Sequence, residues 1–129
     1  MTFLEHYGEM YKRYGASADL TGIKPPFAAQ ITVTDRADGG VFYATNIGGE
    51  TKIAPYDYRD RTVAISTTWE TLEAMLRGEK DPVRAFLSGE VDAEGNVDHA
   101  LALVKALKKK KPKGTAKKAE GQPETERQT

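Results

Sequence analysis

Apolar residues recur at helical spacing in the first segment of the chain, at Leu4, Tyr7, Tyr11 and Tyr14. Intervals of three and four residues place these side chains on one face, so we predict a helix over residues 2–14. Gly15 is expected to end it, because glycine is common immediately after a helix. His6 falls outside the apolar stripe, and we expect its side chain to be exposed to solvent. The following residues, 19–26, hold one glycine and two prolines and predict a linker.

After the linker, apolar residues recur at every second position, which predicts β-strands. Residues 27–34 alternate apolar and polar side chains, which indicates a strand with one buried and one wet face. Three more strands are predicted from β-branched and aromatic residues, over 41–47, 51–54 and 61–66. Glycine pairs at 39–40 and 48–49 predict turns, and Pro55 predicts that the third strand lies at an edge or ends there. Successive hairpins imply an antiparallel sheet.

The spacing returns to a helical period in the second half of the chain. Thr67 and Glu70 have the spacing of a capping box, in which the threonine caps the helix and the glutamate reaches back. The predicted helix has an apolar stripe formed by Trp69, Leu72, Met75 and Leu76. Gly78 is a suitable residue to end this helix. Asp81 and Pro82 predict the start of a short helix, with the aspartate as its cap and the proline in its first turn.

The C-terminal part of the predicted domain contains one more strand and one more helix. The short helix is expected to end at Gly89, and residues 90–94 alternate in a way that predicts a fifth strand. Asn96 is expected to cap the last helix, whose apolar positions are Val97, Ala100, Leu101, Leu103, Val104 and Leu107. This arc is wider than a surface helix needs, so the helix is well buried or part of it faces something other than protein.

Charge divides the chain into two parts. Basic and acidic residues number 19 each, so the formal net charge is zero. Residues 1–107 carry 11 basic and 16 acidic side chains, whereas residues 108–129 carry eight basic and three acidic ones. We therefore predict a folded domain over 1–107 and a disordered lysine-rich tail over 108–129, which has too few apolar residues to fold.

Three roles are open for the lysine-rich tail. It is a solubilising or unselected segment, an arm that contacts an anionic membrane, or an arm that contacts nucleic acid. Nucleic acid is disfavoured as a partner, because the tail lacks the aromatic residues that stack on bases.

The chain lacks the sequence features of membrane-spanning and secreted proteins. No apolar run approaches the roughly 18 residues that a membrane span requires. The first ten residues carry no basic side chain of the kind that opens a secretory signal. We therefore expect a cytoplasmic protein.

Signatures of catalytic and metal sites are also missing from the sequence. The absence of cysteine excludes thiol nucleophiles and cysteine zinc sites, and no glycine-rich phosphate loop is present. Asp98 and His99 are neighbours that point about 100° apart on a helix, which disfavours a catalytic pair. Glu90, Asp92 and Glu94 would share a strand face, which is more often a wet face than a cation site. We predict no catalytic residue, no metal and no cofactor.

A run of motifs between residues 67 and 107 follows a recognisable order. Its members are Leu76-Arg77-Gly78, Asp81-Pro82, Ala85-Phe86-Leu87-Ser88-Gly89, Val91 and Gly95-Asn96. In this order they resemble the sterol carrier protein type-2 family, also called the nonspecific lipid-transfer domain, while residues 27–66 agree in strand order only. The resemblance implies an α+β fold, with a five-stranded, mainly antiparallel sheet covered by helices on one face and an apolar tunnel.

The same resemblance implies a non-enzymatic function in binding and transfer of an apolar lipid, such as a fatty acid, a fatty acyl-CoA or a sterol. The candidate tunnel residues are Phe27, Ile31, Phe42, Met75, Leu76, Phe86, Leu101 and Val104. Met75 is favoured because a thioether adapts to variable ligands, and ordinary core packing is the competing role for each residue.

Two alternatives to simple lipid carriage stay open. One is an accessory subunit that presents a quinone or lipid intermediate to biosynthetic enzymes, as some relatives do. The other is an adaptor that acts through the lysine-rich tail on an anionic membrane or nucleic acid. The oligomeric state is open as well.

Overall fold

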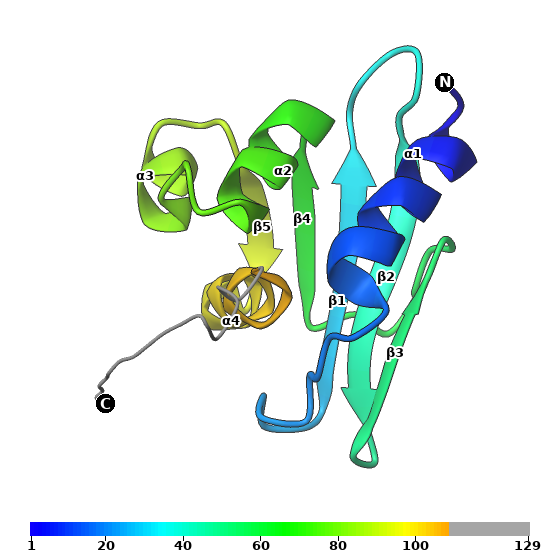
Figure 1. Cartoon of the computed structure of the whole chain (residues 1–129). Coiled ribbons are helices and arrows are strands. Elements are labelled where there is room, and N and C mark those ends of the chain that lie inside the picture. Colours follow the sequence, from blue (N-terminus) through cyan, green and yellow to red (C-terminus); the bar gives the residue numbers. More distant parts are fainter. Residues whose placement is uncertain (109–129) are drawn as a thin grey trace, which may run out of the picture.

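A computed structural model of the chain describes residues 1–108 (Figure 1). Five strands form one sheet in the order β3-β2-β1-β4-β5. The strands are β1 Phe27–Val33, β2 Gly40–Ile47, β3 Glu50–Ala54, β4 Val63–Thr67 and β5 Asp92–Gly95. The lysine-rich tail predicted over 108–129 lies, except for its first residue, outside the described part of the chain.

The sheet is mixed, with one parallel pair among antiparallel ones. β1 pairs antiparallel with β2, β2 with β3, and β4 with β5, whereas β1 and β4 run parallel. The expectation of successive hairpins is therefore wrong between β3 and β4. The connection crosses the sheet instead of turning back, and the Tyr58 ring lies 5.1 Å from that of Tyr43 in β2. The Tyr58 N–H also donates to the Gln30 side chain of β1, at 3.0 Å.

This crossing covers part of the sheet face that points away from the helices. Gln30 and Tyr43 are register partners on that face, and Tyr43 is buried beneath the connection. Ala28 is also buried, so the wet face predicted for the first strand is exposed only in part. The opposite face is apolar and carries Ile31, whose register partners are Phe42 of β2 and Ile65 of β4.

Helices cover this apolar face (Figure 1). They are α1 Phe3–Met10, which continues into one turn of π-helix, η1 Tyr11–Gly15, then α2 Trp69–Leu76, α3 Pro82–Leu87 and α4 Val97–Leu107. The Phe42 ring lies 5.5 Å from Tyr7 of α1 and 6.3 Å from Trp69 of α2. The contacts place both helices on the same side of the sheet.

The buried face of α1 differs from the predicted stripe. Tyr7, Met10 and Tyr14 are buried, but Leu4 is 62% exposed and Tyr11 is 36% exposed. Phe3 takes the place expected for Leu4, because its ring stacks 5.9 Å from that of Trp69. The helix does end at Gly15, as predicted.

The N-terminus of α2 lies one residue later than predicted. The cap is Thr68, whose hydroxyl accepts the Thr71 N–H at 3.2 Å. Thr67 instead ends β4 and donates its hydroxyl to the Glu90 carbonyl at 2.9 Å, so the proposed pair of Thr67 and Glu70 is wrong. The end of this helix is as predicted, with Gly78 in the left-handed region at φ +81°.

The predicted starts of the last two helices are confirmed. Asp81 caps α3 by accepting the Arg84 N–H at 3.2 Å, and Pro82 occupies the first turn. Asn96 caps α4 by accepting the His99 N–H at 3.2 Å. β5 is shorter than predicted, because Glu90 lies outside it and pairs with Lys80 at 2.9 Å.

Candidate apolar ligand site

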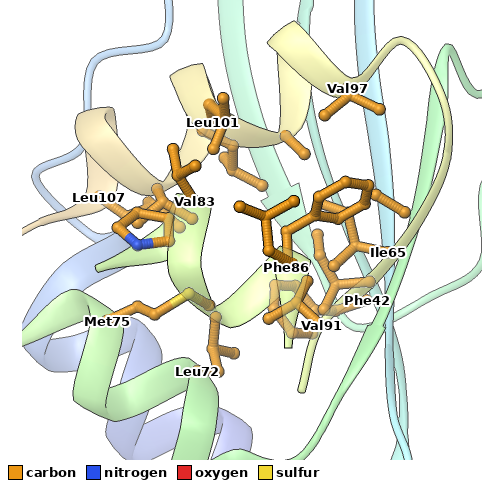
Figure 2. Close-up of a pocket in the computed structure, with 17 residues that line it drawn as sticks. Phe42, Ile65, Leu72, Met75, Val83, Phe86, Val91, Val97, Leu101 and Leu107 are labelled. Atoms are coloured by element: carbon orange, nitrogen blue, oxygen red, sulfur yellow. The ribbon is translucent and has the colours of Figure 1, made fainter. Parts of the chain in front are cut away.

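An apolar cavity lies between the sheet and the helices α2, α3 and α4 (Figure 2). Its volume is about 280 Å³. All seventeen lining residues have apolar side chains: Ile31, Phe42, Ile65, Leu72, Met75, Pro82, Val83, Phe86, Leu87, Val91, Ala93, Val97, Ala100, Leu101, Leu103, Val104 and Leu107. A ligand inside it would meet hydrocarbon and the thioether of Met75, without a polar side chain as a partner.

The alternation of the strands supplies the floor of this cavity. Ile31, Phe42 and Ile65 are register partners in adjacent strands, so their side chains lie side by side on the helix-covered face. Ala93 extends this row because it pairs with Ile65. An unbroken row of apolar side chains across four strands gives the cavity a floor that cannot hydrogen-bond to a ligand.

The wide apolar arc of α4 serves two purposes. Leu103 and Leu107 are buried in the core, whereas Val97 and Leu101 are only partly covered by protein. All four side chains also line the cavity. The structure therefore agrees with both explanations of the arc, because the helix is packed on the sheet and also faces space that is not filled by protein.

The short helix α3 forms the outer wall. Figure 2 shows Phe86 in the middle of the cavity and Val83 beside α4. Val83 is 46% exposed and Leu87 is 77% exposed, although both line the cavity. Apolar side chains that contact both solvent and the cavity mark α3 as the least covered part of the wall.

Six of the eight residues predicted for the tunnel line this cavity. These are Ile31, Phe42, Met75, Phe86, Leu101 and Val104. Phe27 and Leu76 do not line it; both are fully buried and pack in the core away from the cavity. The Phe27 ring packs edge-on against His99 at 5.0 Å. A role in ligand binding stays a prediction for the six that line the cavity.

Several lining residues were absent from the predicted set. The most informative are Val83 and Leu87, which share one face of the short helix with Phe86. Positions 83, 86 and 87 have the spacing of one helical face, so the sequence is enough to group these three side chains. The spacing does not show that α3 lies across from α4 with space between the two helices.

A more polar groove of about 460 Å³ continues from the cavity between α3 and α4. The groove and the cavity share five lining residues, which are Met75, Pro82, Val83, Leu101 and Val104. The groove alone is lined by Ala102 and by four charged residues, namely Asp81, Asp98, Lys105 and Lys108. This groove thus places charged groups beside residues that line the apolar cavity.

His6 is held between two carboxylates, contrary to the expectation that it is exposed. Its Nδ1 lies 2.6 Å from Asp38 Oδ2 and its Nε2 lies 3.2 Å from Glu73 Oε1. The ring also stacks on Trp69, with centroids 4.1 Å apart. Burial lowers the pKa of His6, but the hydrogen bonds to Asp38 and Glu73 outweigh it, so the net pKa is raised.

This histidine is a structural group by its geometry. Both ring nitrogens already have partners, so neither is directed at an open site. The neighbouring Tyr7 is buried, and burial raises the pKa of its hydroxyl to about 12. His99 is likewise engaged, because its Nδ1 lies 2.7 Å from the Thr62 hydroxyl.

Within residues 1–108, no group of three or more histidines and carboxylates could hold a metal ion. Asp92 and Glu94 do share the face of β5 away from the helices, as their pairing with Ser66 and Ala64 shows. Glu90 instead pairs with Lys80, whose hydrogen bonds lower the pKa of the Glu90 carboxyl.

In the same part of the chain, no helix has the length and apolar character of a membrane span.

Comparison with known proteins matches residues 15–108 to the SCP-2 sterol transfer family. A search of curated proteins gives no match. A solution structure of sterol carrier protein domain 2 of Helicoverpa armigera is similar, with 18% identity and a TM-score of 0.60 over 77% of this chain and 82% of that chain. A ubiquinone synthesis protein, UbiJ-SCP2, aligns with 12% identity and a TM-score of 0.57, over 84% of this chain and 93% of that one.

Part of a much longer enzyme has a similar fold. The inverting sec-alkylsulfatase Pisa1 from Pseudomonas sp. aligns with 16% identity and a TM-score of 0.62 over 74% of this chain. The aligned part is only 15% of the alkylsulfatase chain. At these identities the likeness to solved structures concerns the fold alone.

Proposed function

Since the chain belongs to the SCP-2 sterol transfer family, we propose that its cavity binds an apolar lipid and carries it through the cytoplasm without chemical change. The observation that carries this proposal is the cavity wall, in which all seventeen lining residues are apolar. Such a wall favours a hydrocarbon chain over any polar ligand, because each buried methylene contributes about 0.8 kcal/mol.

The size of the cavity supports a slender occupant. Its volume of about 280 Å³ is just below the range of about 300–1,000 Å³ that is typical of ligand pockets. An acyl chain fits a narrow apolar space without needing a hydrogen bond. A solution structure of palmitated SCP2L2 from Aedes aegypti, with 15% identity and a TM-score of 0.56, is a member of this fold that carries such a chain.

Non-enzymatic carriage also agrees with the chemistry of the site. Catalysis requires polar groups that converge on a reacting atom. The cavity offers none from its lining side chains, and both histidines are engaged elsewhere. The proposed function is therefore to hold and release the lipid.

Lipid binding can be tested by native mass spectrometry of the full chain purified from cells, followed by extraction of the bound lipid. The test variant is Ala100→Leu, because Ala100 is buried and lines the cavity. Added methylenes there should fill the space and lower uptake of a fatty acid at least several-fold. The matched control is Ala64→Leu, which adds the same group on the opposite face of the sheet.

Retained uptake in the control and reduced uptake in Ala100→Leu is the expected result. The proposal fails if the purified protein is free of lipid and binds neither fatty acid nor fatty acyl-CoA. It also fails if lipid uptake is the same in all three proteins, since the cavity would then not be the site.

A second candidate function is an accessory subunit that presents a quinone or lipid intermediate to biosynthetic enzymes. The likeness to the ubiquinone synthesis protein UbiJ-SCP2 supports it. Affinity purification of the tagged chain should then recover an enzyme of quinone or lipid synthesis, together with its intermediate. Recovery of the chain with lipid but without such an enzyme would leave simple carriage as the function.

A further inference from the structure

The polar groove between α3 and α4 adjoins the apolar cavity. Five residues form walls of both spaces, including Val83 of α3 and Leu101 of α4. Both are labelled in Figure 2, at the end of the cavity where α3 and α4 meet. The groove is therefore the adjoining space at this end of the cavity for a molecule longer than the cavity.

Two lysines line the groove at the C-terminal end of α4. Lys105 follows Leu101 by four positions, so these two lie on one side of the helix. Lys108 is the residue at the C-cap of α4 and lies near the end of α2, because its Cε would be 3.0 Å from a Cβ placed on Gly78. Within residues 1–108, neither lysine takes part in an ion pair.

In the part of the chain that the structure describes, the two carboxylates in the groove form no ion pair with these lysines. Asp81 is used as the cap of α3. Asp98 lies in the first turn of α4, two turns of helix before Lys105. Lys105 and Lys108 therefore bring two cationic side chains to the end of the groove formed by the C-terminal turn of α4.

We propose that this groove receives the carboxylate of a long-chain fatty acid whose hydrocarbon lies in the cavity. Lys105 and Lys108 are its partners. This inference rests on the proposed function and narrows it, because it favours an acidic lipid over neutral lipids such as sterols and alcohols. The arrangement places charge where the ligand leaves the apolar walls, so the carboxylate keeps contact with water and avoids the cost of burial.

The experiment compares dodecanoic acid with 1-dodecanol, which has the same chain and no charge. Equilibrium binding to the full chain is measured at low ionic strength. The test variant is K105Q/K108Q and the matched control is K24Q/K52Q, which removes the same charge from the linker and from β3. In the test variant we expect dodecanoate affinity to fall about three- to tenfold, the range of a partly exposed ion pair.

Dodecanol affinity should be the same in all three proteins, and the loss for dodecanoate should shrink as salt is added. The inference is overturned if the acid and the alcohol bind equally well and the test variant changes neither, an outcome that leaves the proposed function intact. It is also overturned if K24Q/K52Q loses as much affinity as K105Q/K108Q. Failure of wild-type protein to bind either compound would instead remove the proposed function itself.

Discussion

His6 joins three separate parts of the structure through one ring. It extends from α1, bonds to Asp38 in the turn between β1 and β2, and bonds to Glu73 of α2. Trp69 strengthens the same junction, since its Nε1–H donates to the Asp38 carbonyl at 2.7 Å. The ring therefore fastens α1 to the elements that flank the cavity floor.

The first prediction concerns the dependence of stability on pH. Folding raises the pKa of His6, so the folded protein binds this proton more tightly than the unfolded chain does. The stabilisation is complete below the unfolded pKa of about 6.5, and it is lost as the pH rises through the higher folded value. We expect His6→Gln to be about 1 kcal/mol less stable than wild type at pH 5.5, from loss of charged hydrogen bonds near the surface.

Urea unfolding of both proteins between pH 5.5 and 8.5 measures this difference. It should diminish steadily towards the alkaline end of the range. A difference that is constant with pH, or that grows as the pH rises, would show that the protonated ring is not the stabilising form.

Sequence spacing could predict which residues are apolar and which face they share, but not which of them border empty space. Phe27 and Ile31 lie on the same face of β1, yet the Phe27 ring packs against His99 whereas Ile31 borders the cavity. Their difference depends on the distance between the sheet and each helix. The hydrogen-bond partners of His6 could not be predicted either, because Asp38 and Glu73 lie 32 and 67 positions away in the chain.

At the scale of elements, the glycine that ends β5 is more tightly constrained than those in the turn between β2 and β3. Gly95 has φ +102° and lies against β4, where an added Cβ would be 2.5 Å from the Thr62 carbonyl oxygen. Gly48 has φ +63° in the turn between β2 and β3, and a Cβ there would have no atom within 4 Å. Both glycines have a positive φ, but only Gly48 has space for a side chain.

The second prediction uses this pair of glycines. Gly48→Ala should destabilise the protein by about 1 kcal/mol, the cost of a side chain in the left-handed region. Gly95→Ala should cost more than about 2 kcal/mol, because the alanine must also displace the backbone of β4. Chemical denaturation of the two variants measures the difference. Equal losses would show that β5 shifts to accommodate the methyl group.

Helix ends were the most predictable elements, because their signals are local. Asp81 and Asn96 act as caps by bonding to residues three positions later, a relation that is visible in the sequence. Thr68 was missed since Thr67 offers the same hydroxyl, and only the position of Glu90 beside β4 shows that Thr67 belongs to the strand. The parallel pairing of β4 could not be predicted either, because it depends on the path of the chain between Ala54 and Val63.

At the scale of the whole molecule, charge is distributed very unevenly. Residues 1–107 have five more acidic than basic side chains, and residues 108–129 have five more basic than acidic ones. The proposed groove with Lys105 and Lys108 lies where these two parts meet. We therefore propose that the lysine-rich segment brings the proposed lipid site to an anionic membrane.

The third prediction is that residues 109–129 contribute most of the affinity for anionic vesicles. A chain ending at residue 108 should bind vesicles of phosphatidylserine and phosphatidylcholine much more weakly than the full chain, as measured by co-sedimentation. Binding of the full chain should fall as salt is raised, because exposed charges are screened. Lipid uptake in solution should be unchanged by the truncation. Vesicle binding that survives both the truncation and high salt would contradict an electrostatic role for the tail.

Synthesis from the N-terminus produces the strands in an order that differs from their order in the sheet. β1, β2 and β3 are joined by short turns and can pair as soon as residue 54 is available, whereas β4 must return to β1 from more than 30 positions away. α2, α3 and α4 are made later still. α1 is made first and contacts Phe42 through Tyr7, but the walls that α2, α3 and α4 give the cavity are still missing when β1, β2 and β3 can pair. The cavity can therefore enclose a ligand only after the last helix of residues 1–108 has been made.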